Sequence, residues 1–353
     1  TAAMEKLGID FPVVQAPMGG GPSTVELAAA VSNAGGLGSL AGGYLAPDRL
    51  RAEIRALRSA TKQPFAVNLF VVDPVEVGGE DVEGAARLLS DYRSELGLAD
   101  GPLPESWSED FEQQLAVVVE EKVPVFSFTF GPLPPGSVED MHRNGTVVMG
   151  TATNAAEAVA LRDGGCDLIC AQGAEAGGHH GTWLVDPARS VVGTMALVPL
   201  VCDAVDVPVV AAGGIMDARG VAAALCLGAG AAQMGTAFML CREAGTPPPH
   251  RRAMESARET DVLLTSEVTG RLARGVSNRL MEDLRGRPVP PYPVMNTLTR
   301  DIRRASAARD DPELMSLWCG QGTPLASKAS ARQIVESAAA GVARLGAELR
   351  MFD

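Results

Sequence analysis

Two adjacent histidines and a glutamate lie in a glycine-rich stretch near the middle of the chain. His179, His180 and Glu175 fall within residues 171–183, where four glycines allow the backbone to turn sharply and approach a ligand closely. The apolar run at residues 166–170 comes directly before this stretch and is typical of a buried strand. Titratable side chains that follow a buried strand are a candidate site. The alternative is an ordinary turn with a surface histidine pair.

Glycines also follow two later apolar runs. Gly213 and Gly214 end the run at residues 208–215, and Gly235 lies inside the run at residues 231–239. Exposed backbone N–H groups there, next to a helix that starts at Asp217, could hold a phosphate because their dipoles point at the anion. The alternative is a pair of ordinary tight turns between strands and helices.

Amide side chains occupy strand positions where packing does not require them. Asn68 interrupts an apolar run, and Gln172 ends another. Amides donate and accept hydrogen bonds without charge, which suits the edge of a conjugated heterocycle, and Met18 could pack on the face of such a ring. A buried amide without partners is costly, so the alternative for Asn68 is a hydrogen bond to the surrounding backbone.

The elements that position these residues alternate between strand and helix. Eight short apolar runs predict strands at residues 11–18, 36–41, 64–72, 123–131, 146–152, 166–173, 208–215 and 231–239. Helical spacing predicts helices at residues 24–33, 47–60, 136–143, 154–163, 192–205, 217–227 and 330–350, with two more helical pieces between residues 81 and 121. Such alternation requires parallel pairing, and eight units favour a (β/α)8 TIM barrel with its site at the carboxyl ends of the strands.

The domain organisation follows from where this alternation stops. Residues 1–241 and 328–353 form the predicted barrel, and residues 242–327, rich in proline, form a small mainly helical subdomain on the substrate side. The connection at residues 73–122 predicts two helical pieces and a loop over one end of the barrel. The uncharged run at residues 220–241 could span a bilayer by length, but its glycines favour a helix followed by a buried strand.

Composition excludes several classes of function. The 353 residues contain 30 Lys and Arg against 43 Asp and Glu, a formal net charge of −13, so we expect neither nucleic acid nor a membrane as partner. The six cysteines lack the spacing of metal ligands, and we expect no metal and a reduced, cytoplasmic protein. The first residues show no export signal. A homo-oligomer is compatible with this composition.

Several motifs together resemble the nitronate monooxygenase family, formerly called 2-nitropropane dioxygenases. The matching stretches are Gln15 to Met18, Val67 to Phe70, Gln172 to His179, Ala211 to Ile215, Gln233 to Thr236, Thr269 to Arg271 and Trp318 to Gly322. The resemblance implies a TIM barrel with non-covalent FMN. It places His179 as the catalytic base and gives His180 no catalytic role. The cofactor-binding residues that it implies are Ala16, Pro17, Met18, Asn68, Gln172, Gly177, Gly178, Gly213, Gly214, Gln233, Met234, Gly235 and Thr236.

The activity implied by this resemblance is the oxidation of a small nitroalkane or nitronate by dioxygen to a carbonyl compound and nitrite. One departure bears on substrate preference, because some relatives have a histidine where Thr129 stands. Two other functions stay open. One is an FMN-dependent NAD(P)H enoyl-thioester reductase, for which a basic patch of Arg271, Arg274 and Arg279 could receive an acidic carrier protein. The other is a barrel that binds a phosphorylated metabolite without redox chemistry.

Overall fold

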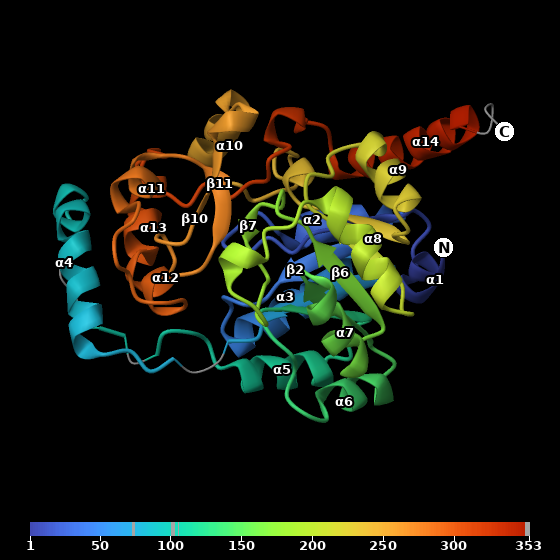
Figure 1. Ribbon diagram of the computed structural model, residues 1–353, viewed down its shortest axis with the longest axis horizontal. Helices are drawn as coiled ribbons and strands as arrows, with labels where there is room; N and C mark the ends of the chain where they lie inside the picture. Colours follow the sequence, from blue (N-terminus) through green and yellow to red (C-terminus); the bar gives the residue numbers. More distant parts are fainter. Residues whose placement is uncertain (73–74, 100–102, 105, 350–353) are drawn as a thin grey trace.

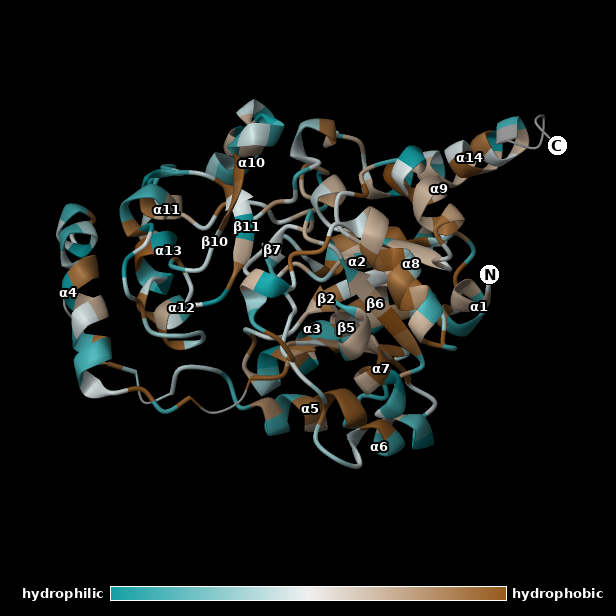
Figure 2. Cartoon of the chain, in the orientation of Figure 1, coloured by the Kyte–Doolittle hydropathy of each residue, from teal (hydrophilic) through white to brown (hydrophobic). Residues whose placement is uncertain are grey.

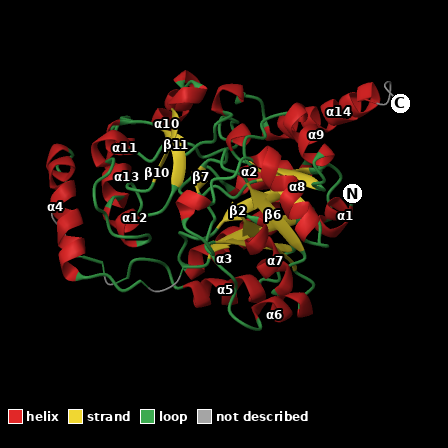
Figure 3. Ribbon diagram, viewed as in Figure 1, coloured by secondary structure: helices red, strands yellow, loops and turns green. Residues whose placement is uncertain are grey.

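Eight parallel strands form the centre of the molecule in a computed structural model that describes residues 1–72, 75–99, 103–104 and 106–349 (Figures 1 and 3). Their order around the sheet is β1-β9-β8-β6-β5-β4-β3-β2. The bounds are β1 Val13–Gln15, β2 Gly38–Ala41, β3 Phe65–Phe70, β4 Val125–Thr129, β5 Val147–Ala152, β6 Leu168–Gln172, β8 Val209–Ala212 and β9 Ala231–Met234. A parallel bridge between Val14 and Leu37 joins the two outer strands. The predicted (β/α)8 barrel is confirmed.

Helices surround the sheet where the apolar spacing predicts them. They are α2 Val25–Asn33, α3 Pro47–Ala60, α5 Phe111–Glu120, α6 Ser137–Arg143, α7 Ala155–Asp163, α8 Thr194–Ala204, α9 Ala218–Cys226 and α14 Ala331–Leu349. Figure 2 shows apolar residues concentrated on β6 and α8. The last helix packs against α9 and α2 and so completes the outer ring. Arg350 and the three residues after it, which we predicted to belong to the barrel, lie outside the described residues.

The uncharged run at residues 220–241 divides into α9 and β9, as the glycines predict. No helix within the described ranges is long and apolar enough to cross a bilayer.

A short first helix closes one end of the barrel. This helix, α1 Ala2–Leu7, places Ala3 and Leu7 in one apolar cluster with Val14, Leu37 and other inward-facing strand residues. The Thr1 hydroxyl also donates a 2.6 Å hydrogen bond to the carbonyl of Gly230, just before β9. The amino ends of the strands are therefore covered, and a ligand can enter at their carboxyl ends. The sequence analysis did not anticipate this helix.

The segment at residues 242–327 contains helices and also two strands. The helices are α10 Pro248–Ser256, α11 Arg279–Leu284, α12 Val294–Leu298 and α13 Arg300–Ala308, and the strands are β10 Val262–Thr265 and β11 Ala273–Val276. The strands β10 and β11 pair with each other in antiparallel orientation. In the same orientation β11 also pairs with β7 Gly178–His179, which belongs to the loop after β6. This small sheet, which the sequence analysis missed, joins the segment to the predicted catalytic loop.

The helix α4 Gly79–Glu95 lies apart from the barrel, beside α12 and α13 (Figure 1). Its buried face, with Ala85 and Leu89, packs against Leu280 and Ile302 of the 242–327 segment. The two helical pieces predicted for this connection are thus confirmed as α4 and α5, and α4 finds its apolar surface on the added segment. Residues 73–74, 100–102 and 105 of the same connection lie outside the described residues.

Candidate active site

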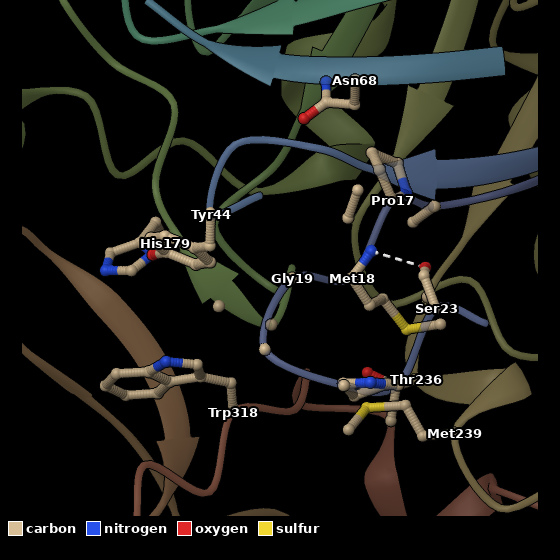
Figure 4. A pocket seen from close by; sticks show the side chains of 18 of the residues that line it. Pro17, Met18, Gly19, Ser23, Tyr44, Asn68, His179, Thr236, Met239 and Trp318 are labelled. Atoms are coloured by element: carbon tan, nitrogen blue, oxygen red, sulfur yellow. Dashed lines mark hydrogen bonds between the residues drawn. The ribbon is translucent and has the colours of Figure 1, made fainter. Parts of the chain in front are cut away.

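A cavity of about 1110 Å³ lies between the carboxyl ends of the barrel strands and the 242–327 segment (Figure 4). Pockets for ligands of cofactor size commonly have volumes of this order. All but one of the predicted site residues line it: Ala16, Pro17, Met18, Asn68, Gln172, Gly177, Gly178, His179, Gly213, Gly214, Gln233, Gly235 and Thr236. The exception is Met234, whose side chain is fully buried in the barrel core.

The glycines after β8 and β9 form a set of free backbone donors. Gly214 has a φ of 71°, a conformation that a residue with a side chain rarely adopts. Within the described part of the chain, the N–H groups of Gly214, Gly235 and Thr236 find no protein acceptor. These donors border one cavity from two neighbouring strands. The arrangement suits an anion such as a phosphate.

Glu175 has a structural role beside these glycines. Its carboxylate accepts hydrogen bonds from the backbone N–H and the hydroxyl of Thr194, at 2.8 Å each. Thr194 is the first residue of α8. A carboxylate at this position satisfies a donor that the helix start leaves free. Glu175 therefore caps α8.

The three amide side chains of the cavity differ in how many partners they have. Asn68 is buried and donates a 3.0 Å hydrogen bond from Nδ2 to Ser127, and its Oδ1 makes no hydrogen bond to the described residues. Gln233 donates from Nε2 to the sulfur of Cys170. The side chain of Gln172 binds the loop after β6, since it donates to the His179 carbonyl at 3.1 Å and accepts from the Gly181 N–H at 2.7 Å. Asn68 and Gln233 thus retain groups for a ligand, whereas Gln172 mainly holds the loop.

Figure 4 shows two sides of the cavity. Pro17, Met18, Met239 and Thr236 lie on one side, and His179 lies with Trp318 on the other. The backbone N–H of Met18 donates a 2.9 Å hydrogen bond to the hydroxyl of Ser23, which holds this turn in place. The sulfur-containing side offers a polarisable surface to a ring, and the opposite side carries the imidazole of His179.

His179 is positioned by the small sheet and by aromatic neighbours. Its backbone in β7 pairs with Ala273 of β11, and its Nε2 lies 2.9 Å from the hydroxyl of Thr269. Its ring centroid lies 5.3 Å from that of Tyr292, 5.8 Å from that of Trp318 and 6.0 Å from that of Phe130. The imidazole is thus fixed on several sides at the cavity wall.

The surroundings of His179 disfavour its charged form. Burial and the positive charges of Arg271 and Arg303 lower the pKa of His179 to about 3. Arg303 lines the cavity, and its hydrogen-bond acceptors, such as the Asn296 and Thr299 carbonyls, are neutral. No carboxylate pairs with Arg303 in the part of the chain that the structure describes. The ring is therefore neutral near pH 7 and lies beside positive charge.

Two other predictions concern residues near His179. His180 is buried, its Nε2 lies 2.9 Å from the carbonyl of Ser190, and it does not line the cavity. Thr129 lines the cavity, with its hydroxyl 3.3 Å from that of Thr151. The structure therefore places Thr129, but not His180, where a substrate could reach it.

The suggested basic patch is absent from the described surface. Arg274 is buried and donates to the carbonyls of Ala174 and Val262. Arg271 also donates to backbone carbonyls, and Arg279 forms an ion pair with Glu95 at 2.5 Å. These arginines stabilise the fold, so they do not offer a docking surface for an acidic carrier.

Sequence reasoning missed several residues of the histidine side. Tyr44, Phe70, Phe130, Arg303 and Trp318 all line the cavity. Thr269 and Trp318 belong to stretches that we matched to the family without assigning a role. The polar sequence around Arg303 gave no local signal, because its position depends on how the 242–327 segment folds over the barrel.

Comparisons with known proteins show the family of the chain. The family model described as nitronate monooxygenase matches residues 1–341. A probable nitronate monooxygenase from Bacillus subtilis is 39% identical over 340 residues, which cover 94% of this chain and 96% of the relative. Another from Staphylococcus haemolyticus is 38% identical over 336 residues and covers 94% of each chain.

Two solved structures resemble the whole molecule. A nitroalkane oxidase from Streptomyces ansochromogenes has a TM-score of 0.93 and 39% identity, and covers 99% of this chain and 100% of its own. FabK from Thermotoga maritima has a TM-score of 0.80 and 30% identity, and covers 100% of this chain and 99% of its own. Both likenesses include the barrel and the 242–327 segment.

Proposed function

This chain belongs to the nitronate monooxygenase family, and we propose that it uses FMN and dioxygen to convert nitroalkanes or their nitronates into carbonyl compounds and nitrite. The chain is a flavin-dependent oxidoreductase of nitroalkanes or nitronates. The observation that carries the finer proposal is the neutral imidazole of His179 at the wall of the large cavity. FMN, when bound, supplies the electron acceptor that dioxygen regenerates.

The residues of the cavity fit FMN. The free N–H groups of Gly214, Gly235 and Thr236 would hold its phosphate, since backbone donors suit an anion there. Asn68 and Gln233 would bind the polar edge of the ring, because each has an amide group without a protein partner. Met18 would pack against the ring. Met234 lies outside the cavity and supports this site through its carbonyl, which accepts from the Ala16 N–H at 2.9 Å.

His179 would remove the proton next to the nitro group. The hydroxyl of Thr269 has one hydrogen, which it donates to the Arg271 carbonyl at 3.2 Å, so it accepts a hydrogen bond from Nε2 of His179. This assignment leaves Nδ1 with the lone pair that takes the substrate proton. General-base catalysis of this kind typically contributes about 10²- to 10⁴-fold in rate.

Arg271 and Arg303 would stabilise the product of that proton transfer. The nitronate carries a negative charge, and both cations are close enough to lower the pKa of His179. The value of about 3 describes the ring beside two cations. An anionic nitronate within about 4–6 Å of the ring would raise this pKa, because an opposite charge favours the imidazolium. The site thus favours the ion pair that proton transfer creates.

The test compares two forms of the substrate. His179→Ala should retain FMN and lose activity on a neutral nitroalkane by at least about 10²-fold, with a much smaller loss on the preformed nitronate, which needs no base. Oxygen uptake at equal flavin content measures both rates. His142→Ala is the control, because His142 is exposed on α6 and pairs with Asp167 just before the amino end of β6, and neither residue lines the cavity. Equal losses on both substrates would rule out the base assignment.

The enoyl-thioester reductase alternative predicts a different reaction. Rapid bleaching of the flavin by NADH without oxygen would support the reductase, and a stable flavin would support the oxidase. The buried position of Arg274 and the hydrogen bonds of Arg271 to backbone carbonyls argue against the carrier-protein docking that we considered for a reductase. Membership of an oxidoreductase family is inconsistent with the third alternative, a barrel without redox chemistry.

A further inference from the structure

A buried carboxylate holds the backbone that follows His179. Glu157, in the first turn of α7, is 0% exposed. Its Oε1 accepts hydrogen bonds from the Thr182 hydroxyl at 2.9 Å, the Trp183 N–H at 2.8 Å and the Leu184 N–H at 3.1 Å. Its Oε2 accepts from the N–H and hydroxyl of Thr153, at 2.7 and 2.8 Å. Three consecutive residues of the catalytic loop thus bind one carboxylate oxygen.

These donors keep Glu157 charged without an ion pair. Burial alone would raise the pKa of Glu157, but the hydrogen bonds from Trp183, Thr153 and Leu184 lower it below the usual range. No Lys or Arg lies within ion-pair distance of Glu157 among the described residues. A full charge in such a position is costly unless every donor stays in place. The carboxylate therefore restrains the loop strongly.

A partly buried guanidinium, that of Arg271, binds the carbonyl groups of the same loop. Arg271 donates from Nε to the His180 carbonyl at 3.2 Å and from a terminal nitrogen to the Thr182 carbonyl. Its guanidinium also lies 3.8 Å from the centre of the Phe130 ring, which contacts the His179 ring edge-on. The N–H groups of the loop thus face an anion, and its carbonyls face a cation. Glu157 also raises the pKa of Arg271 through its charge, against the larger effect of burial.

We propose that Glu157 and Arg271 form a pair of positioning residues that clamp the loop from His180 to Leu184 and so fix the imidazole of His179 against Thr269. The pair acts through the loop, and neither residue lines the cavity. The inference rests on the proposed role of His179 as the base. Loosening the clamp should let the imidazole rotate and should leave the cofactor-binding glycines of β8 and β9 in place.

Glu121 provides a matched control within the same chain. It is also a buried glutamate, 8% exposed, and its pKa is also lowered, here by Arg55, Arg51 and Arg58 against the effect of burial. It follows α5, its arginine partners lie on α3, and it does not line the cavity. Glu121→Gln therefore reproduces the loss of a buried charge without touching the loop.

The experiment compares Glu157→Gln with Glu121→Gln. We expect Glu157→Gln to reduce the turnover of a neutral nitroalkane at least tenfold more than that of the preformed nitronate, at equal FMN content. A glutamine has one acceptor oxygen where Glu157 has two, so its NH₂ group must face either the loop N–H groups or the Thr153 N–H, and it can accept from neither. Glu121→Gln should leave the ratio of the two rates unchanged. Arg271→Lys should show the same selective loss, because an ammonium cannot make both hydrogen bonds and the ring contact.

A second readout is independent of activity. The chain has four histidines, so nitrogen-15 NMR of histidine-labelled protein can follow each ring. Glu157→Gln should shift the His179 signals and leave those of His142 in place. This shift depends only on the position of the ring, so it is expected even if His179→Ala shows that His179 is not the base. Unchanged His179 signals would overturn the clamp, and so would equal losses on both substrates in Glu157→Gln if His179→Ala itself shows the selective loss.

A milder variant tests the same contact if Glu157→Gln does not fold. Thr182→Val removes one of the hydrogen bonds to Glu157 and keeps the carboxylate. It should give a smaller selective loss in the same direction, of about two- to fivefold, together with a smaller shift of the His179 signals. Wild-type behaviour of Thr182→Val in both measurements would also contradict the clamp.

Discussion

The hydroxyl of Thr269 is the group whose removal tests the proposed chemistry most directly. Thr269 is 0% exposed, and its hydroxyl links His179 Nε2, at 2.9 Å, to the Arg271 carbonyl, at 3.2 Å. Valine has nearly the same shape, so Thr269→Val removes both hydrogen bonds and leaves no sizeable void. Two part-buried polar groups, His179 Nε2 and the Arg271 carbonyl, then lose this partner.

The expected size of the effect follows from these two contacts. A buried donor or acceptor left without a partner costs about 1–3 kcal/mol. If about 1–2 kcal/mol of this cost falls on the orientation of His179 in the transition state, turnover of a neutral nitroalkane falls about 5- to 30-fold. The rest lowers the free energy of unfolding. The preformed nitronate, which needs no base, should react at close to the wild-type rate.

The assay is oxygen uptake with the two substrates at equal flavin content. Thr269→Ser is the matched control, because it keeps the hydroxyl and loses one methyl group. The serine variant should therefore retain most of the activity on the neutral substrate. Wild-type rates in the valine variant, or equal losses in the valine and serine variants, would refute the assignment of Thr269 as the group that sets the tautomer.

Two further predictions concern cofactor binding and pH. Gly214→Ala should weaken FMN binding about tenfold, measured by flavin fluorescence, because the added Cβ disturbs a donor of the proposed phosphate site. Gly286→Ala is the control, because Gly286 has a φ of 70°, close to the 71° of Gly214, but lies in open space. This variant should bind FMN normally. The pKa of His179 in the folded protein is lowered to about 3, whereas an unfolded histidine titrates near about 6.5. As the pH falls from 7.5 to 4.5, residue 179 becomes protonated in the unfolded chain but stays neutral in the folded protein. The free energy of unfolding therefore decreases on acidification. Over this pH range the free energy of unfolding of His179→Ala should decrease by on the order of 2 kcal/mol less than that of the wild-type protein, as measured by denaturant unfolding. Identical pH dependence in both proteins would contradict the lowered pKa.

The sequence by itself determined the barrel and the glycine and amide groups on one side of its cavity. Each barrel strand is a short apolar run, and each covering helix repeats its apolar residues with helical spacing, so both leave a local signal. The glycines after β8 and β9 and the amide of Asn68 stood out because they break such patterns. In a parallel barrel all strand ends meet at one face, so residues such as Asn68 and Gly214 could be placed at one site before the structure was known.

Tertiary structure decided how the catalytic side is built. The pairing of β7 with β11, the docking of α4 on the 242–327 segment and the contact of His179 with Thr269, 90 residues away, have no periodic signal in the sequence. A two-residue strand is too short to show alternation. The burial of a charge such as Glu157 depends on donors that distant segments bring to it. These features arise from long-range packing, because a polar group can be buried only where the folded chain supplies its partners.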